Sequence, residues 1–492
     1  MVQRFDAIVI GAGQSGPFLA ARFAQAGRKV ALIEREHLGG TCVNDGCIPT
    51  KTLVASARAA HVVRHAAAFG VQHDGAVRVD MKAVKARKDA VVNQSVAGLT
   101  SWLGGLANLT LIRGAARFTG PLRVAVGDDE YEAAQVFINT GGRATVPDWP
   151  GVHDVPYLTN TSMMAVDFLP AHLAVIGGSY IGLEFAQMYR RFGSAVTVIE
   201  AAPRLIARED AEVSAEVRAL LEREGIAVHV GAQDLGLARD GDGVRVGFAL
   251  DGHARSVAAS HLLLAVGRRP NTENLGLAAA GVNVDARGFI VVDDELRTSA
   301  PGVWALGDVN GRGAFTHTSY NDFEIVAANL LEGGTRRVSD RITAYGVFTD
   351  PPLGRVGMSE AEVRASGRAA LVATLPMARI GRARERGETA GFIKVLVDAN
   401  TQRILGAALL GIEADEVVQL LLLAMAADLP YTRIQQTMWI HPTVTELLPT
   451  LFAGLKPLPR ERRPNDRTRR HRQVRHRAGL PRRSRSRCTR CA

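Results

Sequence analysis

The chain has 492 residues, a length that suggests about three domains. Hydrophobic residues make up 47% of it, as in a globular protein, and the longest apolar stretch, Val417 to Leu429, is shorter than the roughly 18 residues that a membrane span needs. The formal net charge of +10 comes from the end of the chain, because residues 459–492 alone carry a net charge of +12 and leave residues 1–458 at −2. The main part of the chain therefore lacks the charge of a nucleic-acid-binding protein.

Only four cysteines are present, at positions 42, 47, 488 and 491, so the chain does not look like a secreted protein held together by disulfides. The N-terminus runs directly into a predicted strand, Asp6 to Ile10, without the charged and apolar regions of a signal peptide. We therefore expect no membrane association and a cytoplasmic location.

The first predicted elements form a βαβ unit. The short apolar strand Ala7 to Ile10 leads through a glycine-rich turn into a helix that ends near Gly27, and the next strand, Lys29 to Ile33, ends on Glu34. The glycines of the turn are Gly11, Gly13 and Gly16. Such glycines let the backbone approach a pyrophosphate at the helix N-terminus, and the acid is placed to bind an adenosine ribose.

A redox motif follows, because Cys42 and Cys47 stand five residues apart between Gly39 and Lys51. On an ideal helix their Cα atoms would be roughly 8 to 9 Å apart, whereas a disulfide tolerates about 7 Å. The helix must therefore be distorted, and Gly46 and Pro49 provide the means. A strained, reducible bridge suits catalysis. Zinc binding is not favoured, because no second pair of ligands lies nearby.

The dinucleotide pattern repeats after two helical segments, Leu53 to Phe69 and Met81 to Leu103. The strand Leu173 to Ile176 leads into a turn and a helix to about Gly193, and the strand from Ala195 to Ile199 ends on Glu200. The turn contains Gly177, Ser179 and Gly182, with serine where the middle glycine is expected. The first glycine and the acid are 23 residues apart in both units, which favours two dinucleotide sites over two ordinary glycine turns.

Three later stretches complete the pattern. Two strands end at Asn139 to Gly142 and at Ala265 to Pro270, and Val303 to Asp308 is a strand followed by a Gly-Asp turn.

From Tyr345 onward the nucleotide signatures stop, and an apolar helix is predicted from Glu413 to Leu429. The run His441-Pro-Thr-Val-Thr-Glu446 near the end offers a histidine suited to acid–base chemistry and a carboxylate to orient it, although a lone histidine is more often structural.

With these motifs in this order, residues 1–458 closely resemble the pyridine nucleotide-disulfide oxidoreductases, flavoproteins that include dihydrolipoamide dehydrogenase, glutathione reductase and mercuric reductase. The resemblance implies an α/β fold with two Rossmann-like dinucleotide-binding domains, for FAD and NAD(P), and a C-terminal α+β dimerisation domain. The implied boundaries are 1–150 with 275–339 for the FAD domain, 151–274 for the NAD(P) domain, 340–458 for the dimerisation domain and 459–492 for an Arg-rich disordered tail. A homodimer follows from this resemblance.

The resemblance also implies catalytic roles. Cys47 would lie nearer the flavin, and Cys42 would be the thiol that attacks the substrate, its pKa lowered by helix-start amides and a nearby base. Lys51 and Glu184 would pair beside the flavin; the plainer alternative is a solvated lysine and a surface glutamate. His441, oriented by Glu446, would come from the partner subunit and act on the exchanging thiol.

The cofactors implied are FAD and NAD(P)H. Residues matching the family's cofactor-binding positions are Gly11, Gly13, Gly16, Glu34, Thr41, Lys51, Gly114, Thr140, Gly141, Asp308, Thr316, Gly177, Ser179, Gly182, Glu200 and Gly267. Asp308 would bind a ribityl hydroxyl. NADH is favoured because Glu200 would accept the ribose hydroxyls and repel a 2′-phosphate, although Arg204 is nearby.

The predicted function is an FAD-dependent NAD(P)H oxidoreductase that passes reducing equivalents through Cys42 and Cys47 to a small disulfide or a metal ion. The active-site run looks most like mercuric-reductase-like members, but the chain has neither their N-terminal metal-binding domain nor their adjacent C-terminal cysteines. One alternative is a redox-sensing or nucleic-acid-binding flavoprotein that uses the basic tail. Another is a shuttle in which Cys488 and Cys491 relay electrons, as in large thioredoxin reductases.

The tail itself is low in apolar periodicity and dense in arginine, so we expect residues 459–492 to be disordered. The plainest interpretation is an extension without function, such as the product of a shifted reading frame. Electrostatic binding to nucleic acid or an acidic membrane is the alternative. A zinc site would need His471, His476, Cys488 and Cys491 together, and Cys-x-x-Cys alone is a weak signal.

Overall fold

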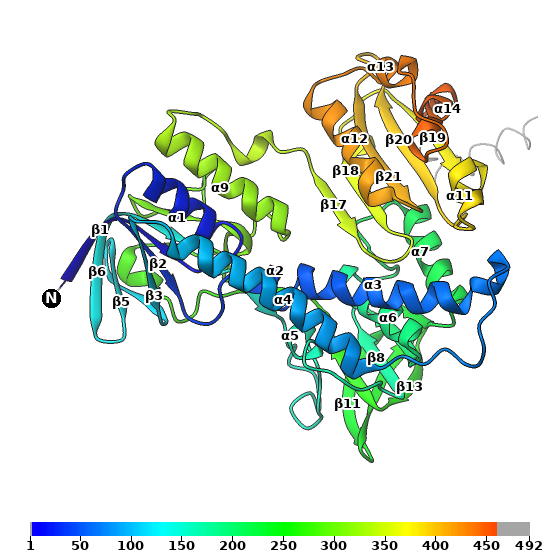
Figure 1. The fold of residues 1–492 in the computed structure, drawn as a ribbon, viewed down its shortest axis with the longest axis horizontal. Helices are drawn as coiled ribbons and strands as arrows, with labels where there is room; N and C mark the ends of the chain where they lie inside the picture. Colours follow the sequence, from blue (N-terminus) through cyan, green and yellow to red (C-terminus); the bar gives the residue numbers. More distant parts are fainter. Residues whose placement is uncertain (1, 460–492) are drawn as a thin grey trace, which may run out of the picture.

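The computed structural model describes residues 2–459, which form three groups of strands and helices (Figure 1). The first sheet has seven strands in the order β3-β2-β1-β6-β5-β4, with β16 beside β6. Its strands are β1 (Val2–Ile10), β2 (Val30–Glu34), β3 (Leu109–Arg113), β4 (Ala116–Gly120), β5 (Arg123–Val126), β6 (Asp129–Ile138) and β16 (Val303–Ala305). β16 runs parallel to β6, so a late segment of the chain completes the first sheet.

The helices α1 (Gly16–Gln25) and α9 (Thr316–Leu331) pack against each other beside this sheet (Figure 1). The helical segments predicted next are present as α3 (Cys47–Arg64), followed by the 3-10 turn η1 (Ala66–Phe69), and as α4 (Met81–Gly104). Asp80 caps α4 by accepting hydrogen bonds from the backbone N–H groups of Lys82 and Ala83, which fixes where that helix begins.

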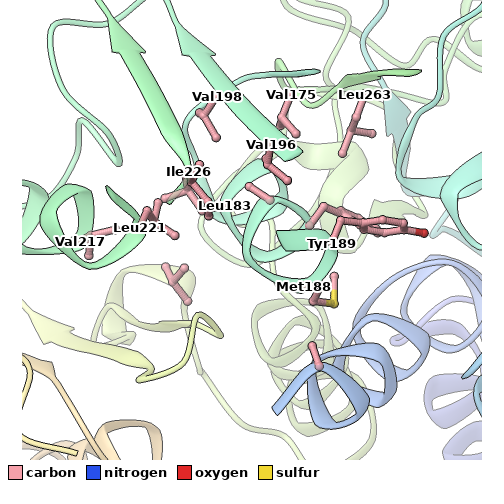
Figure 2. Packing of buried hydrophobic residues seen from close by; sticks show 14 of the residues in the cluster. Val175, Leu183, Met188, Tyr189, Val196, Val198, Val217, Leu221, Ile226 and Leu263 are labelled. Carbon is pink, nitrogen blue, oxygen red and sulfur yellow. The ribbon is translucent and has the colours of Figure 1, made fainter. Parts of the chain in front are cut away.

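The second sheet is parallel, in the order β10-β9-β8-β14. Its strands are β8 (His172–Ile176), β9 (Ala195–Glu200), β10 (Ala227–Val230) and β14 (His261–Leu264), and the helices of this part are α6 (Tyr180–Phe192) and α7 (Ala211–Arg223). A separate antiparallel sheet follows, made of β11 (Gln233–Asp240), β12 (Gly243–Leu250) and β13 (His253–Ala259). Leu183 and Met188 of α6 pack against Val175 and Val196 of the sheet (Figure 2). Burying each such side chain stabilises the fold by about 1.5–3 kcal/mol.

Short elements connect the two sheets. The strands β7 (Gly142–Ala144) and β15 (Arg268–Pro270) pair antiparallel and carry the chain out of the first sheet and back again. The remaining short helices of this part are α5 (Asn160–Met163) and α8 (Leu277–Ala280).

The third sheet is antiparallel, in the order β17-β18-β21-β20-β19-β22. Its strands are β17 (Ala344–Val347), β18 (Leu353–Gly357), β19 (Ala370–Pro376), β20 (Phe392–Asp398), β21 (Ile404–Leu410) and β22 (Lys456–Pro457), and its helices are α10 (Glu360–Ala365), α11 (Gly381–Glu385), α12 (Ala414–Ala426), α13 (Tyr431–Gln436) and α14 (Leu448–Ala453). The apolar helix predicted from Glu413 to Leu429 is α12, and it ends at Ala426 because Asp428 adopts a left-handed φ of 49°.

None of the helices within residues 2–459 is both long and apolar enough to span a membrane. The predictions for the Arg-rich tail, including its disorder, its zinc ligands and its relay cysteines, fall outside the described residues except at Pro459.

Candidate active site

The predicted distortion between the two cysteines is present as a break between helices. The helix α2 (Gly40–Asn44) carries Cys42 and ends before Asp45, and α3 begins at Cys47. A Cβ on Gly46 would lie 2.7 Å from the carbonyl oxygen of Thr41 and 3.1 Å from the Cα of Cys42. Glycine is therefore needed for the two helices to approach this closely, and both cysteines are free thiols in this structure.

Thr316 contacts this pair, with its Oγ1 at 3.2 Å from the Sγ of Cys47. The pKa of Cys47 falls to about 6, first because Cys42 donates a hydrogen bond to it, and further through Thr316 and the charge of Lys51, while burial and Glu184 oppose the shift. The pKa of Cys42 is raised, first by its hydrogen bond to Cys47 and then by burial. The negative charge of the pair therefore belongs on Cys47, whereas the sequence argument put the lowered pKa on Cys42.

Lys51 and Glu184 form an ion pair, as predicted, with Nζ and Oε2 2.6 Å apart. Glu184 is only 3% exposed, and its other oxygen accepts a hydrogen bond from the backbone N–H of Phe348 at 2.9 Å. The lysine ammonium also lies 4.5 Å from the centre of the Phe348 ring. The alternative of a solvated lysine and a surface glutamate is therefore wrong.

The side chains of Cys42, Cys47, Lys51 and Glu184 face a cavity of about 1040 Å³, a size at the upper end of ligand pockets. Predicted cofactor residues that line the cavity are Gly11, Gly13, Glu34, Thr41, Lys51, Gly114, Thr140, Gly141, Asp308 and Thr316. Gly16 does not line it; a Cβ there would lie 2.1 Å from the carbonyl oxygen of Gly11, so this glycine allows α1 to start against the turn.

The cavity fits a dinucleotide at the first glycine turn. Gly11 has a φ of +100°, and a Cβ on it would lie 2.3 Å from the carbonyl oxygen of Asn139, so the backbone itself forms the wall. Glu34 accepts hydrogen bonds from the N–H groups of Ala12 and Glu36 at 2.8 and 2.7 Å. Asn139 also lines the cavity, and its buried Nδ2 has no hydrogen-bond partner among residues 2–459.

Asp308 lies at the other side of the cavity with Arg268, whose Nε is 3.7 Å from its carboxylate. Burial raises the pKa of Asp308, and the charge of Arg268 opposes that shift. Arg268 also donates to the carbonyl of Gly142. Arg268 lies in a strand that the sequence predicts, but the sequence motifs assign it no role. Tyr180 and Ser319 also line the cavity without having been assigned a role from the sequence. Tyr180 stands between Ser179 and Gly182 of the second glycine turn, whereas no sequence motif marks Ser319.

The second glycine turn repeats the first in detail. Gly177 has a φ of +118°, and Glu200 accepts hydrogen bonds from the N–H groups of Gly178 and Ala202 at 2.5 and 2.6 Å. Ser179 is exposed and extended, so a side chain is tolerated at this position. A Cβ on Gly182 would lie 2.0 Å from the carbonyl oxygen of Gly177, as at Gly16 in the first unit.

The second turn borders the cavity described above through Tyr180 and Ile181, but its motif residues face away from it. None of Gly177, Ser179, Gly182 and Glu200 lines that cavity. Gly267, the remaining predicted cofactor residue, lies outside it too, with a φ of +119° and a carbonyl that accepts a hydrogen bond from Thr145 at 2.9 Å. Two dinucleotide cradles on one chain suit a transfer between two bound nucleotides.

His441 and Glu446 form a pair, with Nδ1 2.8 Å from Oε2, but they are not part of the cavity. His441 is 79% exposed, and its neighbours Met438 and Ile440 are 95% and 79% exposed. The carbonyl of Pro442 next to it accepts hydrogen bonds from Arg382. A single chain therefore brings Cys42, Cys47, Lys51 and Glu184 together and leaves the histidine on an exposed face.

Comparison with known proteins agrees with this geometry. Residues 5–322 match the family model described as pyridine nucleotide-disulphide oxidoreductase, and residues 343–452 match the dimerisation domain of the same proteins. A probable pyridine nucleotide-disulfide oxidoreductase, RclA of Escherichia coli, is 38% identical over 92% of this chain and 100% of its own length. A dihydrolipoyl dehydrogenase of Thermus scotoductus is 36% identical over 90% of this chain and 96% of its own.

A mercuric reductase of Streptomyces lividans is 37% identical over 90% of this chain and 94% of its own length. Among solved structures, the HOCl-induced flavoprotein disulfide reductase RclA from Escherichia coli superimposes with a TM-score of 0.83 at 37% identity, covering 91% of this chain and 99% of that one. A Cu(II) complex of the same protein gives the same TM-score. Sequence and structure comparisons therefore lead to one group of flavoproteins.

Proposed function

The chain belongs to the pyridine nucleotide-disulphide oxidoreductase family, and from this membership we propose how its own residues carry out the reaction. The protein is an FAD-dependent NAD(P)H oxidoreductase with an α/β fold, and it carries the family's dimerisation domain, in keeping with a homodimer.

The cavity would hold FAD and the second glycine turn would hold NAD(P)H. Gly11, Glu34 and Asn139 offer the cradle for the pyrophosphate and ribose, and Asp308 the acceptor for a hydroxyl. When bound, FAD accepts a hydride from NAD(P)H and supplies two electrons to the cysteine pair. The cation of Lys51, held by Glu184, would stabilise negative charge on a ligand at this end of the cavity.

The observation that carries the proposal is the placement of the cysteine pair on the wall of the cavity, with Cys47 against Thr316 and beside the Lys51–Glu184 ion pair. Cys47 holds the negative charge, while the raised pKa of Cys42 means that this thiol needs a base before it attacks an acceptor. We assign that base to His441 of a second copy, oriented by Glu446. Its high exposure in the single chain leaves it available to a partner subunit.

For a disulfide acceptor, the sulfur of Cys42 would form a bond to one acceptor sulfur while the acceptor's S–S bond breaks, and the leaving thiolate would take the proton held by the histidine. The thiolate of Cys47 would then attack the sulfur of Cys42 and release the second half of the acceptor as a thiolate, which takes a proton from solvent. The acceptor gains two electrons and two protons, and the cysteines are left as a disulfide.

The acceptor is a small disulfide or a metal ion that binds thiolates. The related mercuric reductase and the Cu(II) complex of RclA make Hg(II) and Cu(II) the first metal ions to test. We further propose a cytoplasmic location, since a free and reducible cysteine pair suits a reducing compartment.

The test is a turnover screen of the purified protein with NADH and NADPH against lipoamide, glutathione disulfide, thioredoxin, Hg(II), Cu(II) and quinones. Cys42→Ser should abolish turnover with the true acceptor. An acceptor that is reduced equally fast by Cys42→Ser would take its electrons without the cysteine pair, and the proposal would be wrong for that acceptor.

A further inference from the structure

The hydroxyl of Thr316 touches Cys47, and its position depends on the residue before it. Thr316 is the first residue of α9, and Phe315 is the capping residue of that helix. The backbone of Phe315 is tied to the side chain of Thr318, which accepts from its N–H at 3.1 Å and donates to its carbonyl at 2.7 Å. Any shift of Phe315 therefore moves Thr316 relative to the thiol.

The ring of Phe315 is surrounded by other aromatic rings. Tyr345 of β17 lies parallel to it within 7°, with ring centres 5.7 Å apart. The imidazole of His317 lies parallel to it within 8° at 5.4 Å, and Tyr180 of α6 is tilted against it at 5.5 Å. Such aromatic pairs contribute beyond their buried area and have preferred geometry, so they orient the ring.

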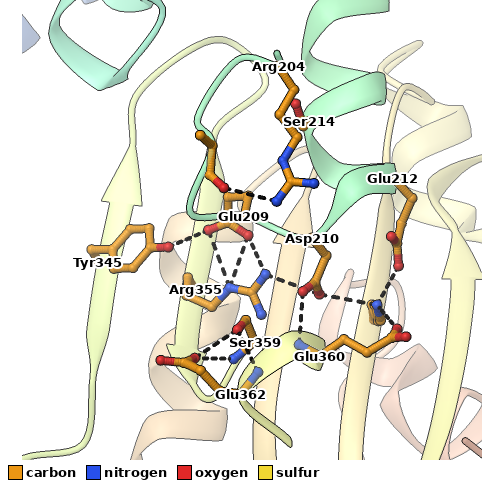
Figure 3. A network of polar contacts seen from close by, with 12 residues as sticks. Arg204, Glu209, Asp210, Glu212, Ser214, Tyr345, Arg355, Ser359, Glu360 and Glu362 are labelled. Carbon is orange, nitrogen blue, oxygen red and sulfur yellow. Dashed lines mark hydrogen bonds and ion pairs between the residues drawn. The ribbon is translucent and has the colours of Figure 1, made fainter. Parts of the chain in front are cut away.

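The rings contributed by β17 and α9 are themselves fixed. The hydroxyl of Tyr345 donates a hydrogen bond to Oε1 of Glu209 at 2.6 Å, and the Nε2–H of His317 donates to the carbonyl of Ala344 at 2.7 Å. Glu209 is fully buried and paired with Arg355, which also contacts Asp210 at 3.3 Å (Figure 3). Strand β17 thus joins the start of α9 to a buried ion-pair network.

We propose that Tyr345 and His317 clamp the ring of Phe315 and thereby hold the hydroxyl of Thr316 against the sulfur of Cys47. Tyr345 is a positioning residue in this arrangement, since it acts through Phe315 and Thr316 and lies outside the cavity lining. The inference rests on the proposed role of Cys47 and extends it, because it assigns control of that thiol to a strand of the third sheet.

The clamp has a measurable effect, because a hydrogen bond to a thiolate lowers its pKa. Thr316 is one of the groups that lower the pKa of Cys47. Other titratable groups that bear on this thiol are Cys42 of α2, Lys51 of α3, and Tyr180 and Glu184 of α6. Tyr345→Leu replaces none of these residues, but Tyr180 also packs against Phe315. Comparison with Thr316→Val, which removes the hydroxyl without disturbing the stacked rings, therefore shows whether a change in the titration of Cys47 comes from Thr316.

The experiment uses the FAD-containing dimer with Cys42→Ser, in which Cys47 is the single thiol of the pair. The long-wavelength absorbance between the Cys47 thiolate and oxidised flavin is titrated against pH. Tyr345→Leu removes the stacked ring and should raise the midpoint by about 1 pH unit, as expected for most of one hydrogen bond to a charged group. Thr316→Val removes the hydroxyl itself and therefore gives the largest rise in the midpoint that the clamp can control. Tyr345→Phe keeps the ring, so its midpoint should stay within about 0.3 pH unit of the parent.

Tyr131→Leu is the matched control, since Tyr131 packs against Phe5 in the first sheet and lies away from the cavity. It should leave the midpoint unchanged. If Tyr345→Leu does not fold, His317→Ala tests the other half of the clamp and should also raise the midpoint.

The outcomes separate this inference from the proposed function. Absence of the band in the Cys42→Ser parent would overturn the role of Cys47 itself. A band with the same midpoint in Tyr345→Leu and in the parent would overturn the clamp alone, as would a Thr316→Val variant that titrates like the parent.

Discussion

The ammonium of Lys51 lies 2.6 Å from the carboxylate of Glu184, although the two residues are 133 positions apart in the chain. The pair joins α3, which starts at Cys47, to α6, which starts behind the second glycine turn. Since Glu184 also accepts the N–H of Phe348, one buried carboxylate links the cysteine helix, the nucleotide helix and the segment after β17. Electron transfer between two bound cofactors requires such a fixed geometry.

Glu184→Gln should therefore slow flavin reduction by NADH. The amide has the same shape and can still accept the N–H of Phe348, but it no longer balances the charge of Lys51. We expect a fall of about tenfold in the stopped-flow reduction rate, about 1.4 kcal/mol in the barrier, with little change in FAD content. Glu388→Gln is the control, because Glu388 pairs with Arg58 further along α3. Equal rates in both variants would contradict a role for the Lys51 pair.

The two-electron-reduced protein should show a long-wavelength charge-transfer band that follows the ionisation of Cys47. The pKa of this thiol is lowered to about 6, so the thiolate and its band should be present above that pH and fade as the pH falls below it. Cys47→Ser should abolish the band at every pH. A band that survives this substitution would assign the flavin-side thiol to another residue.

Mixed dimers test the role of His441 across the subunit interface. A chain with Cys42→Ser and a chain with His441→Ala are each expected to be inactive as homodimers. Combined in one dimer, they contain one intact site of two, so about half of the normal activity should return. If demonstrably mixed dimers stay inactive, the histidine serves the site of its own chain.

The nucleotide preference should favour NADH. Glu200 holds the second glycine turn through Gly178 and Ala202, and its charge would repel a 2′-phosphate. The guanidinium of Arg204 donates to the carbonyl of Ala207 within its own loop, so Arg204→Ala should change the NADH to NADPH ratio of kcat/KM by less than about twofold. A clearly higher kcat/KM for NADPH in the unmodified protein would overturn the assignment.

Truncation after Pro459 should leave FAD content, dimerisation and turnover unchanged. The cut lies beyond β22, and it keeps the hydrogen bonds of Leu458 to Ala370 and of Arg364 to Pro459. The basic pI of the chain, about 9.8, should fall because the arginines of the tail are removed. A truncated enzyme that reduces small disulfides normally but loses a protein or metal acceptor would indicate a relay through the removed cysteines.

The sequence was sufficient for features encoded by local spacing. The two glycine turns with their terminal acids, the broken helix at Cys42 and Cys47, and the pairing of His441 with Glu446 all follow from residues close together in the chain. Lys51 and Glu184 could be paired only through the family resemblance, because no periodicity connects positions so far apart.

Other contacts have no local signal at all. Glu209 and Arg355 are 146 positions apart, and Tyr345 of the third sheet meets Phe315 at the start of α9. The lowered pKa of Cys47 and the raised pKa of Cys42 also depend on the folded environment, because the hydrogen bond between the two thiols, together with burial, decides which sulfur holds the charge. Composition and spacing carry no information on that choice.

The carboxylates of Glu34 and Glu200, at the ends of the strands that follow the two glycine turns, keep the nucleotide-binding segments ordered whether or not a nucleotide is bound. Each carboxylate accepts one hydrogen bond from a backbone N–H of its glycine turn and one from the backbone just after its own strand. The helix that connects the two strands is therefore held at both ends by the protein itself. A nucleotide that enters has little chain left to order, and one that leaves does not release a loop. A dinucleotide exchanged at every turnover therefore meets the same rigid receptor each time, and the ordering entropy is spent once, when the protein folds.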